Sequence, residues 1–346
     1  MSALTDVARL AGVSKATASR ALSGRGYVSA ETRDRVVAAA AAIGYVVSSN
    51  AASLVTGQSR TIGVLLPAIN RWYFGEVLDG IESALIAAGY DLTLYRLSSD
   101  AAERRRVFEY FLVRKRVDAV VAVGVELSAH ELTLLSGLNK PIVGIGGPID
   151  GLATLSIDEA ATARLATEHL VSLGHTDILM IGGDQAGEVD FHVHSQRFAG
   201  FVAALADAGL DSEDRFRPAP ISIPGGFTVG LSVLADPRSR PTAIVAGCDE
   251  VAIGVVIAAR QLGIQVPAQL SIIGIDGHDL AEMFGLTTLA QHPKLQGTRA
   301  IDLLLGELEH PASGSAGWQE FPTSLTVRSS TTAPAEVALA TAARGD

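Results

Sequence analysis

Residues 2–21 read SALTDVARLAGVSKATASRA, two short helical patterns on either side of Gly12. Thr5 is placed to cap the first helix. The apolar positions of that helix recur at helical spacing: Val7, Ala8 and Ala11. Gly12 falls where a tight turn favours a residue without a Cβ atom. The stretch therefore predicts a helix that ends in a turn.

The second pattern, residues 15–22, follows Ser14, which is a good N-cap. Its inward positions are small or apolar: Ala18, Ala21 and Leu22. Ser29 is placed to cap a third helix over 31–43, which Gly44 ends. Two short helices joined by a turn of three or four residues form a helix-turn-helix unit, and the small inward side chains allow the close packing that it needs.

In such a unit the second helix enters the major groove of DNA. Its expected exposed positions are Lys15, Ala16, Ser19 and Arg20. Arg20 can bond guanine O6 and N7 with two hydrogen bonds, and Lys15 suits a base or a phosphate. Thr17 and the backbone amides after Ser14 suit phosphate. The pattern alone also allows a three-helix cap with a solvated basic face.

The charges support DNA binding at this end only. The 346 residues carry a net charge of −10, but residues 1–60 have seven Lys/Arg against three Asp/Glu, a net of +4, which leaves −14 for the rest. A cationic head attracts phosphates, whereas an acidic body is repelled by them. We therefore expect DNA to meet the head.

From residue 60 onward, short apolar runs alternate with helical patterns. The expected strands are 62–66, 91–95, 119–123, 142–145, 178–181, 243–246 and 270–275. The expected helices are 76–88, 101–113, 159–173, 195–208 and 251–262. This alternation predicts two α/β halves with parallel sheets and helices on both faces. Ligands of such sheets bind where the strands end, so we expect a site between the halves.

Several segments closely resemble the lactose/galactose repressor (LacI/GalR) family. In the head they are TDVARLAGVS (5–14), ATASRAL (16–22), GYVS (26–29), ETR (31–33) and GY (44–45). In the body they are TIGVLLP (61–67), EHLVSLGH (168–175), QRFAGF (196–201), CDEVAIG (248–254) and SIIGID (271–276). The resemblance extends to about Thr331 and makes the helix-turn-helix interpretation firm.

The resemblance implies an all-α helix-turn-helix head and a periplasmic-binding-protein-like body of two doubly wound parallel-sheet subdomains joined by three crossovers. The expected segments are 1–46 for the head, 47–59 for a hinge or linker and 60–331 for the effector-binding body. The expected subdomains are 60–157 with 290–318, and 158–289 with 319–331. The Ala-rich tail, 332–346, lacks a heptad repeat and is expected to be disordered.

The hinge departs from the family pattern. In the family a hinge helix folds on operator DNA and inserts a leucine into the minor groove, which implies that role for Leu54. Ala52 stands where an arginine is usual, and Val47-Ser48 where a Pro-Asn pair is usual. The residues alone favour a plain Ser-rich linker. In the head, the resemblance adds Thr5 and Tyr27 to the expected DNA contacts.

The resemblance also implies an effector site of aromatic, arginine and carboxylate side chains. The expected residues are Phe74, Trp72, Asp184, Arg197, Asp249 and Asp276, with Tyr73 and Asp190 as further possibilities. Rings suit the face of a sugar or a base, and Arg197 suits paired hydroxyls or a carboxylate. Cys248 stands where an Asn is usual, which removes a donor from the expected sugar contact. For each carboxylate a helix cap or solvated loop is the alternative.

Other chemistry is not expected. His192 and His194 lack further metal ligands nearby in sequence, which favours a polar loop beside the cleft over a metal site. The Gly144–Gly147 and Gly182–Gly183 stretches lack the order of a phosphate loop and are expected to be turns. Cys248, the one cysteine, has no evident His partner, and a nucleophile elbow is absent. We therefore expect no enzyme, no cofactor and no metal site.

Together these features predict a transcriptional regulator, a repressor, whose partners are double-stranded operator DNA, a second copy of the chain and a small effector. A sugar or sugar derivative is favoured as the effector, and a nucleobase is the alternative. A solute-binding protein for transport is a second hypothesis, which the absent signal peptide and the cationic head oppose. An enzyme on the same body is a third, which the lack of a catalytic constellation opposes. The N-terminus lacks a signal peptide and the longest apolar runs are too short for a bilayer, which predicts a cytoplasmic protein with no membrane partner.

Overall fold

The computed structural model describes residues 4–23, 26–45, 59–98, 100–112, 117–137, 139–185, 191–310 and 317–335. The chain divides into a head, which runs from Met1 to Thr61 and includes residues 116–118, and a body formed by the remainder. Within the described ranges, no helix is long and apolar enough to cross a membrane.

The head contains three described helices around a small core. They are α1 (Leu4–Ala11), α2 (Lys15–Ser23) and α3 (Ala30–Ala42). The core consists of Val7, Ala8, Ala11, Ala18, Ala21, Val36, Ala39 and Ala40. The N–H of Thr17 donates to Ser14 Oγ at 3.1 Å and that of Thr32 to Ser29 Oγ at 3.3 Å, so both caps are formed. The expected Thr5 cap is wrong, because α1 already includes Leu4 and Thr5 lies inside its first turn.

The first half of the body is built on a six-stranded sheet in the order β11-β5-β4-β3-β1-β2. Its strands are β1 (Thr61–Leu66), β2 (Asp91–Arg96), β3 (Ala119–Val123), β4 (Ile142–Ile145), β5 (Ala153–Ser156) and β11 (Gly317–Glu320). β1 pairs parallel with β3, with Ile62 opposite Ala119. All five residues of β3 are buried, as expected for a strand covered on both faces.

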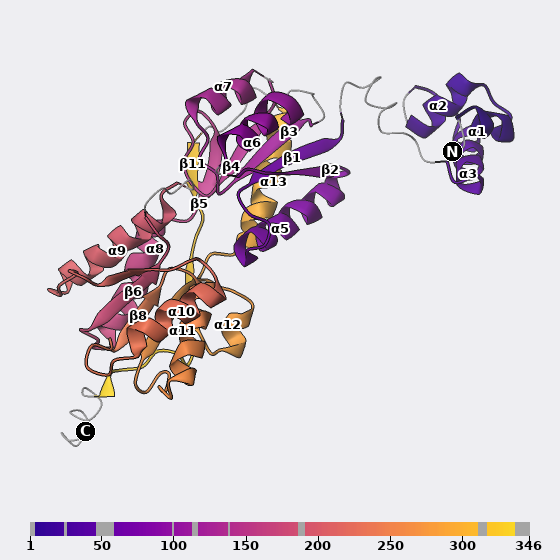
Figure 1. Ribbon diagram of the computed structural model, residues 1–346. Helices are drawn as coiled ribbons and strands as arrows, with labels where there is room; N and C mark the ends of the chain where they lie inside the picture. Colours follow the sequence, from indigo (N-terminus) through magenta and orange to yellow (C-terminus); the bar gives the residue numbers. More distant parts are fainter. Residues whose placement is uncertain are drawn as a thin grey trace. The chain divides into compact units, whose positions relative to one another are not determined.

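The helices of the first half are α5 (Trp72–Ala88), α6 (Ala101–Arg106), the π-helix η1 (Val107–Leu112), α7 (Ala129–Ser136) and α13 (Pro293–Glu309). Figure 1 shows α13 lying beside α5, although the two are far apart in sequence. Glycine makes this close approach possible, because a Cβ atom on Gly80 would lie 2.0 Å from the carbonyl oxygen of Lys294.

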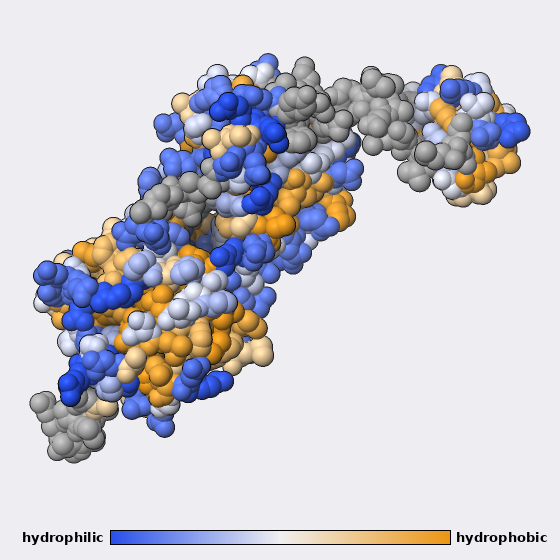
Figure 2. Space-filling view, viewed as in Figure 1, coloured by the Kyte–Doolittle hydropathy of each residue, from blue (hydrophilic) through white to orange (hydrophobic). Residues whose placement is uncertain are grey.

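The second half has a six-stranded sheet in the order β12-β10-β9-β8-β6-β7. Its strands are β6 (Ile178–Gly182), β7 (Phe216–Pro218), β8 (Ala243–Ala246), β9 (Ser271–Asp276), β10 (Thr287–Ala290) and β12 (Ser324–Thr326). Its helices are α8 (Glu159–Ser172), α9 (Val193–Asp207), α10 (Ile223–Leu234), α11 (Asp249–Gln261) and α12 (Leu280–Met283). β12 is antiparallel to β10, and the other paired strands of the sheet are parallel. Figure 2 shows apolar side chains at the surface over α10, α11 and α12.

The expected fold class, a helical head followed by two parallel-sheet α/β halves, is confirmed. The chain crosses between the halves before α8, between β10 and α13, and between β11 and β12. The last crossover follows Glu320, slightly later than the expected boundary at 318–319, because β11 pairs with β5 through Glu320.

Two expectations for single segments are wrong. The first helix of the body begins at Trp72 rather than at residue 76, so the aromatic residues before 76 lie on the helix and not in a loop. The tail expected to be disordered, 332–346, was placed too early, because residues 332–335 are described and Thr332 is ordered, while 336–346 lie outside the described residues. The N–H of Thr332 donates to Ser271 Oγ at 3.0 Å, and His175 Nε2 lies 2.8 Å from the carbonyl oxygen of Thr332.

Candidate functional site

A pocket of about 230 Å³ lies between the two halves of the body, where strands of both sheets end. The first half contributes Arg71, Tyr73, Phe74, Gly124 and Gly146 to its lining. The second half contributes polar residues, chiefly Glu159, His194, Arg197 and Asp276. The pocket therefore has an aromatic wall on one side and a charged wall on the other.

The aromatic wall is the first turn of α5. The rings of Tyr73 and Phe74 pack edge to face, with centroids 5.3 Å apart. Phe74 covers Gly124, where a Cβ atom would come within 2.8 Å of the ring and where φ is +56°. Glycine at this position leaves room for the ring beside the backbone after β3. The helix thus holds Phe74 as a rigid apolar surface of the pocket.

Arg197 forms the centre of the charged wall. It lies on α9 and is only 5% exposed. Its Nε donates to Glu159 Oε2 at 2.6 Å, and Nη1 donates to the carbonyl oxygen of Gly247. Burial alone would lower the pKa of Arg197, but Glu159 and Asp276 raise it above its ordinary value. The guanidinium therefore stays charged and held in one orientation.

Asp276 ends β9 and faces the same pocket. Its Oδ1 accepts a hydrogen bond from Gln291 Nε2 at 2.6 Å. Burial raises the pKa of Asp276 to about 8, with Asp249 and Glu159 adding to the effect, and Arg197 opposes it. Its φ of +136° is unusual for a residue other than glycine, and such strain is common at binding sites. Near neutral pH this carboxyl group can both donate and accept hydrogen bonds.

Asp249 lies outside the pocket lining, which corrects the expectation of effector contact. It is buried at the start of α11. Its Oδ2 accepts from the N–H groups of Gly277 and His278 at 2.9 and 2.8 Å, and Thr288 Oγ1 donates to both oxygens. These bonds occupy the carboxylate, so Asp249 holds the loop after β9 in place.

Trp72 and Asp184 also lie apart from the lining. The Trp72 ring stacks on His278, and its Nε1 donates to Asp279 Oδ2 at 3.2 Å, so it joins α5 to the loop after β9. Asp184 follows β6 and is exposed. Asp190 is outside the described residues. Of the six expected effector residues, the structure brings together Phe74, Arg197 and Asp276.

Sequence reasoning missed Glu159, His194 and Gln291 as pocket residues. Glu159 begins α8, where an acidic residue is an ordinary feature of a first turn. The sequence predicts His194 in a polar loop beside the cleft rather than in its lining, and Gln291 lies in a crossover that has no helix or strand pattern. Within the described residues, no group of His, Cys, Asp and Glu has the arrangement of a metal site.

On the head, α2 presents the surface expected to meet DNA. Lys15, Ala16, Ser19 and Arg20 are exposed, and Thr17 is half-buried. The stem of Arg20 passes over Gly26, where a Cβ atom would lie 3.3 Å from Arg20 Cδ. Thr5 is exposed, as is Tyr27, at 93%. The hinge residues Val47, Ser48, Ala52 and Leu54 lie outside the described residues.

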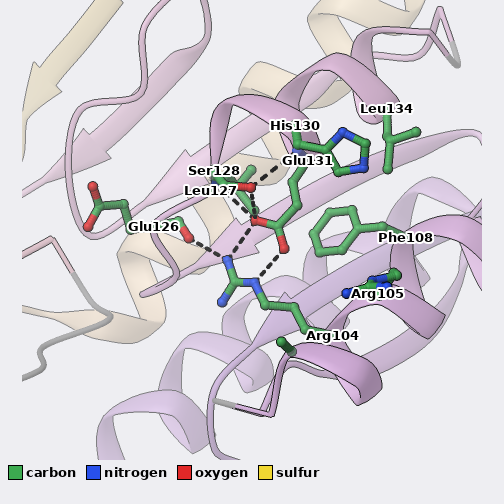
Figure 3. A pocket seen from close by; sticks show the side chains of 10 residues that line it. Arg104, Arg105, Phe108, Glu126, Leu127, Ser128, His130, Glu131 and Leu134 are labelled. Carbon is green, nitrogen blue, oxygen red and sulfur yellow. Dashed lines mark hydrogen bonds and ion pairs between the residues drawn. The ribbon is translucent and has the colours of Figure 1, made fainter.

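A second pocket, of about 490 Å³, lies within the first half between α6–η1 and α7 (Figure 3). Arg104 donates to both oxygens of Glu131, which also accepts from the N–H and hydroxyl of Ser128. Burial raises the pKa of Glu131, but the bonds from Arg104 and Ser128 outweigh it and leave the pKa below its usual value. This ion pair links α6 to α7.

Comparison with known proteins places the chain in a family. Residues 3–48 match the model for bacterial regulatory proteins of the lacI family, and residues 167–331 match a periplasmic binding protein-like domain. A repressor named PurR from Glaesserella parasuis is 32% identical over 319 residues, which cover 89% of this chain and 91% of that protein. The chain belongs to the lacI family of bacterial regulatory proteins. The expected resemblance is thus confirmed.

Other members of the lacI family agree with this placement. The ribose operon repressor of Escherichia coli is 32% identical over 317 residues, which cover 90% of this chain and 94% of that protein. A crystal structure of the lac repressor dimer bound to operator and the anti-inducer ONPF superposes with a TM-score of 0.83 at 26% identity, over 96% of this chain and 99% of that one. Head and body together are therefore those of a DNA-binding regulator of this family.

Proposed function

We propose that this lacI-family protein is a transcriptional repressor whose affinity for operator DNA is set by a small effector bound between the two halves of the body. The observation that carries the proposal is the pocket itself, in which a fixed Arg197, a strained Asp276 and the Phe74 ring converge. In this proposal the protein binds DNA and an effector and catalyses no reaction. Allosteric control requires that the effector bind two states of the body with different affinity.

A sugar or sugar derivative fits this pocket best. Phe74 offers one ring face to the apolar side of a pyranose or furanose, and Glu159, Arg197, Asp276 and Gln291 supply donors and acceptors for hydroxyl groups. The volume of about 230 Å³ suits a monosaccharide more than a longer chain. The likeness to a ribose operon repressor agrees with this class.

A nucleobase is the second candidate. Its flat face suits Phe74, and its polar edge suits Arg197 and Asp276. The similarity to repressors named PurR supports it. The lining residues of the second half favour the sugar, because they include the aliphatic Ile221 and no Phe, Tyr or Trp ring on which the other face of a base could stack.

We infer that the protein acts in the cytoplasm as a homodimer, with each head on one half of a pseudo-palindromic operator. Apolar side chains reach the surface on both halves, with Ile86 65% exposed on α5 and Met283 80% exposed on α12. Figure 2 shows the apolar surface around α12. Surface of this kind suits an interface between two copies.

A salt-dependent gel shift on the DNA upstream of the protein's own coding region tests the DNA role. A specific complex should form and should weaken steeply as salt rises. The regulator proposal fails if no specific, salt-sensitive complex forms with or without candidate effectors.

A thermal-shift screen of monosaccharides and nucleobases tests the effector class, because a ligand of the native state raises its melting temperature. A melting temperature raised only by nucleobases would replace the sugar with the second candidate.

A further inference from the structure

A buried glutamine, Gln296, connects the two walls of the pocket without lining it. It lies in the first turn of α13 and is 0% exposed. Tyr73 Oη donates to Gln296 Oε1 at 3.1 Å, and Gln296 Nε2 donates to the carbonyl oxygen of Gln291 at 2.7 Å. A carbonyl oxygen only accepts, so the amide nitrogen must face Gln291 and the amide oxygen must face Tyr73.

The hydrogen-bonded chain continues to Asp276. Gln291 Nε2 donates to Asp276 Oδ1 at 2.6 Å, and the N–H of Gln291 donates to the carbonyl oxygen of Asp276 at 3.1 Å. The side-chain donors therefore run in one direction, from the phenol of Tyr73 through Gln296 and Gln291 to the carboxyl group. In a chain of this kind, each hydrogen bond polarises and strengthens its neighbours.

The two ends of this chain belong to different halves of the body. Tyr73 lies on α5 in the first half, and Asp276 ends β9 in the second. The middle members lie on either side of the crossover from β10 to α13. A rotation of one half against the other moves these ends relative to each other, so the chain responds to that rotation.

The phenol is well suited to remain a donor. Burial raises the pKa of Tyr73 above its ordinary value, and Glu159 and Asp276 raise it further. A buried donor that loses its acceptor is costly, so Tyr73 and Gln296 are expected to stay paired or to separate together with the crossover.

We propose that Gln296 is a positioning residue that couples the effector pocket to the crossover between β10 and α13. It holds Tyr73 and Asp276 in the orientation in which an effector meets them, and it transmits a change at Asp276 to the segment about which the halves turn. This inference rests on the proposed function, because it concerns the same pocket. The alternative is that Gln296 is only a well-bonded residue of the core.

The first test needs no effector. The chain has two tryptophans, and Trp72 lies next to Tyr73 and stacks on His278 of the second half. In a Trp318→Phe background, acrylamide quenching of fluorescence reports the exposure of Trp72 alone. Gln296→Leu should raise the quenching constant about two-fold or more, because Tyr73 and the start of α5 lose their tie to the crossover.

Matched variants separate this effect from general loosening. Gln265→Leu makes the same chemical change at an exposed site and should leave quenching unchanged. Tyr73→Phe removes the same hydrogen bond from its other end, so the Tyr73→Phe/Gln296→Leu double variant should quench no more than the stronger single variant. Gln296→Glu keeps the acceptor for Tyr73 and loses the donor to Gln291. Its quenching constant should lie between those of the wild type and Gln296→Leu. Wild-type quenching in both Gln296 variants overturns the proposal.

The second test uses D-ribose as the probe and fluorescence anisotropy of operator DNA as the readout. Gln296→Leu should keep operator affinity without ribose within two-fold of wild type, and should reduce the ribose-induced change in affinity at least three-fold. A merely structural Gln296 would lower the melting temperature and leave that change intact, which contradicts the proposal. If ribose has no effect on the wild type, ribose is excluded as the effector, while the quenching result still decides the role of Gln296.

Discussion

The ring of Trp72 stacks on the ring of His278, with centroids 4.7 Å apart and planes inclined by 19°. The contact links the first turn of α5 to the loop after β9, and Arg71 adds an ion pair with Glu250 at 3.8 Å nearby. The two halves of the body thus touch beside the pocket. We expect an effector to change these contacts when it changes the angle between the halves.

Arg20→Ala should weaken specific operator binding by about 1–3 kcal/mol, because it removes the side chain that we propose binds guanine in bidentate fashion. The exposed position of Arg20 on α2 is the basis of this expectation. Arg35→Ala on α3 removes the same charge and serves as the matched control in an anisotropy titration. Equal losses in the two variants would mean that Arg20 contributes charge and no base recognition.

Arg197→Ala should destabilise the body by about 3–5 kcal/mol, because it leaves Glu159 buried without its partner. Thermal or urea unfolding measures this loss. Adding Glu159→Gln to the variant should recover much of the stability, since the buried charge is then removed.

The same double variant separates packing from ligand binding. It should bind operator DNA as the wild type does and show no response to an effector. Loss of operator binding in this restabilised variant would show that Arg197 supports the fold and not the effector.

The free energy of unfolding should decrease as pH rises from about 4 to about 8 through the contribution of Asp276. Its pKa is raised in the folded protein to about 8, so the folded state keeps a proton that the unfolded chain has already released. Stability from this group is therefore complete at low pH and is lost as pH approaches 8. Asp276→Asn should flatten this part of a urea-unfolding pH profile. Parallel profiles for the two proteins would rule out a raised pKa.

Gly147→Ala should destabilise the body, because the added Cβ would lie 2.4 Å from Phe191 Cγ. Phe191 belongs to the second half, is 7% exposed and has a φ of +54°, so it has little freedom to move away. Differential scanning calorimetry should show a lower melting temperature.

Gly306→Ala is the matched control for that variant. Among the described residues, nothing lies within 4 Å of the added Cβ, and the site is within α13, so stability should increase by about 0.5–1 kcal/mol. Phe191→Ala removes the ring that the added Cβ would meet, so the double variant should lose less stability than the sum of the two single variants. A fully additive loss of stability would contradict the contact.

Ile86→Lys should shift the protein from dimer to monomer and weaken operator binding, because it places a charge in an exposed apolar surface. Sedimentation velocity measures the shift. Leu165→Lys, on α8 at 40% exposure, is the control and should leave the oligomeric state unchanged. A dimer that survives Ile86→Lys would place the interface elsewhere.

The sequence predicted the elements with strong local signals. The caps at Ser14 and Ser29 and the buried strands β3, β4 and β8 were located within a residue or two. The sequence did not predict elements whose formation depends on tertiary contacts. α10, with two glycines in its first turns, was not among the expected helices. Its Gly226 meets the backbone of Val251 on α11, where a Cβ atom would come within 2.3 Å of the carbonyl oxygen.

The candidate site was likewise predicted only in part. Motif resemblance located Phe74, Arg197 and Asp276, which line the pocket. It also suggested Asp249, whose carboxylate is instead used by the N–H groups of residues 277 and 278. Gln296 carries no local signal, because a glutamine in a first helical turn is ordinary. Only the fold brings it between Tyr73 and Gln291.

The return of α13 and β11 to the first half has a consequence for synthesis on the ribosome. The described helices of the head are complete by Ala42, so the head can fold early. The first half lacks α13 and β11 until residue 320 has emerged, and the second half lacks β12 until residue 326. The faces of α5 and β5 that these segments cover stay uncovered until translation is nearly finished. A nascent chain therefore carries a DNA-reading head well before it carries the body that would regulate it.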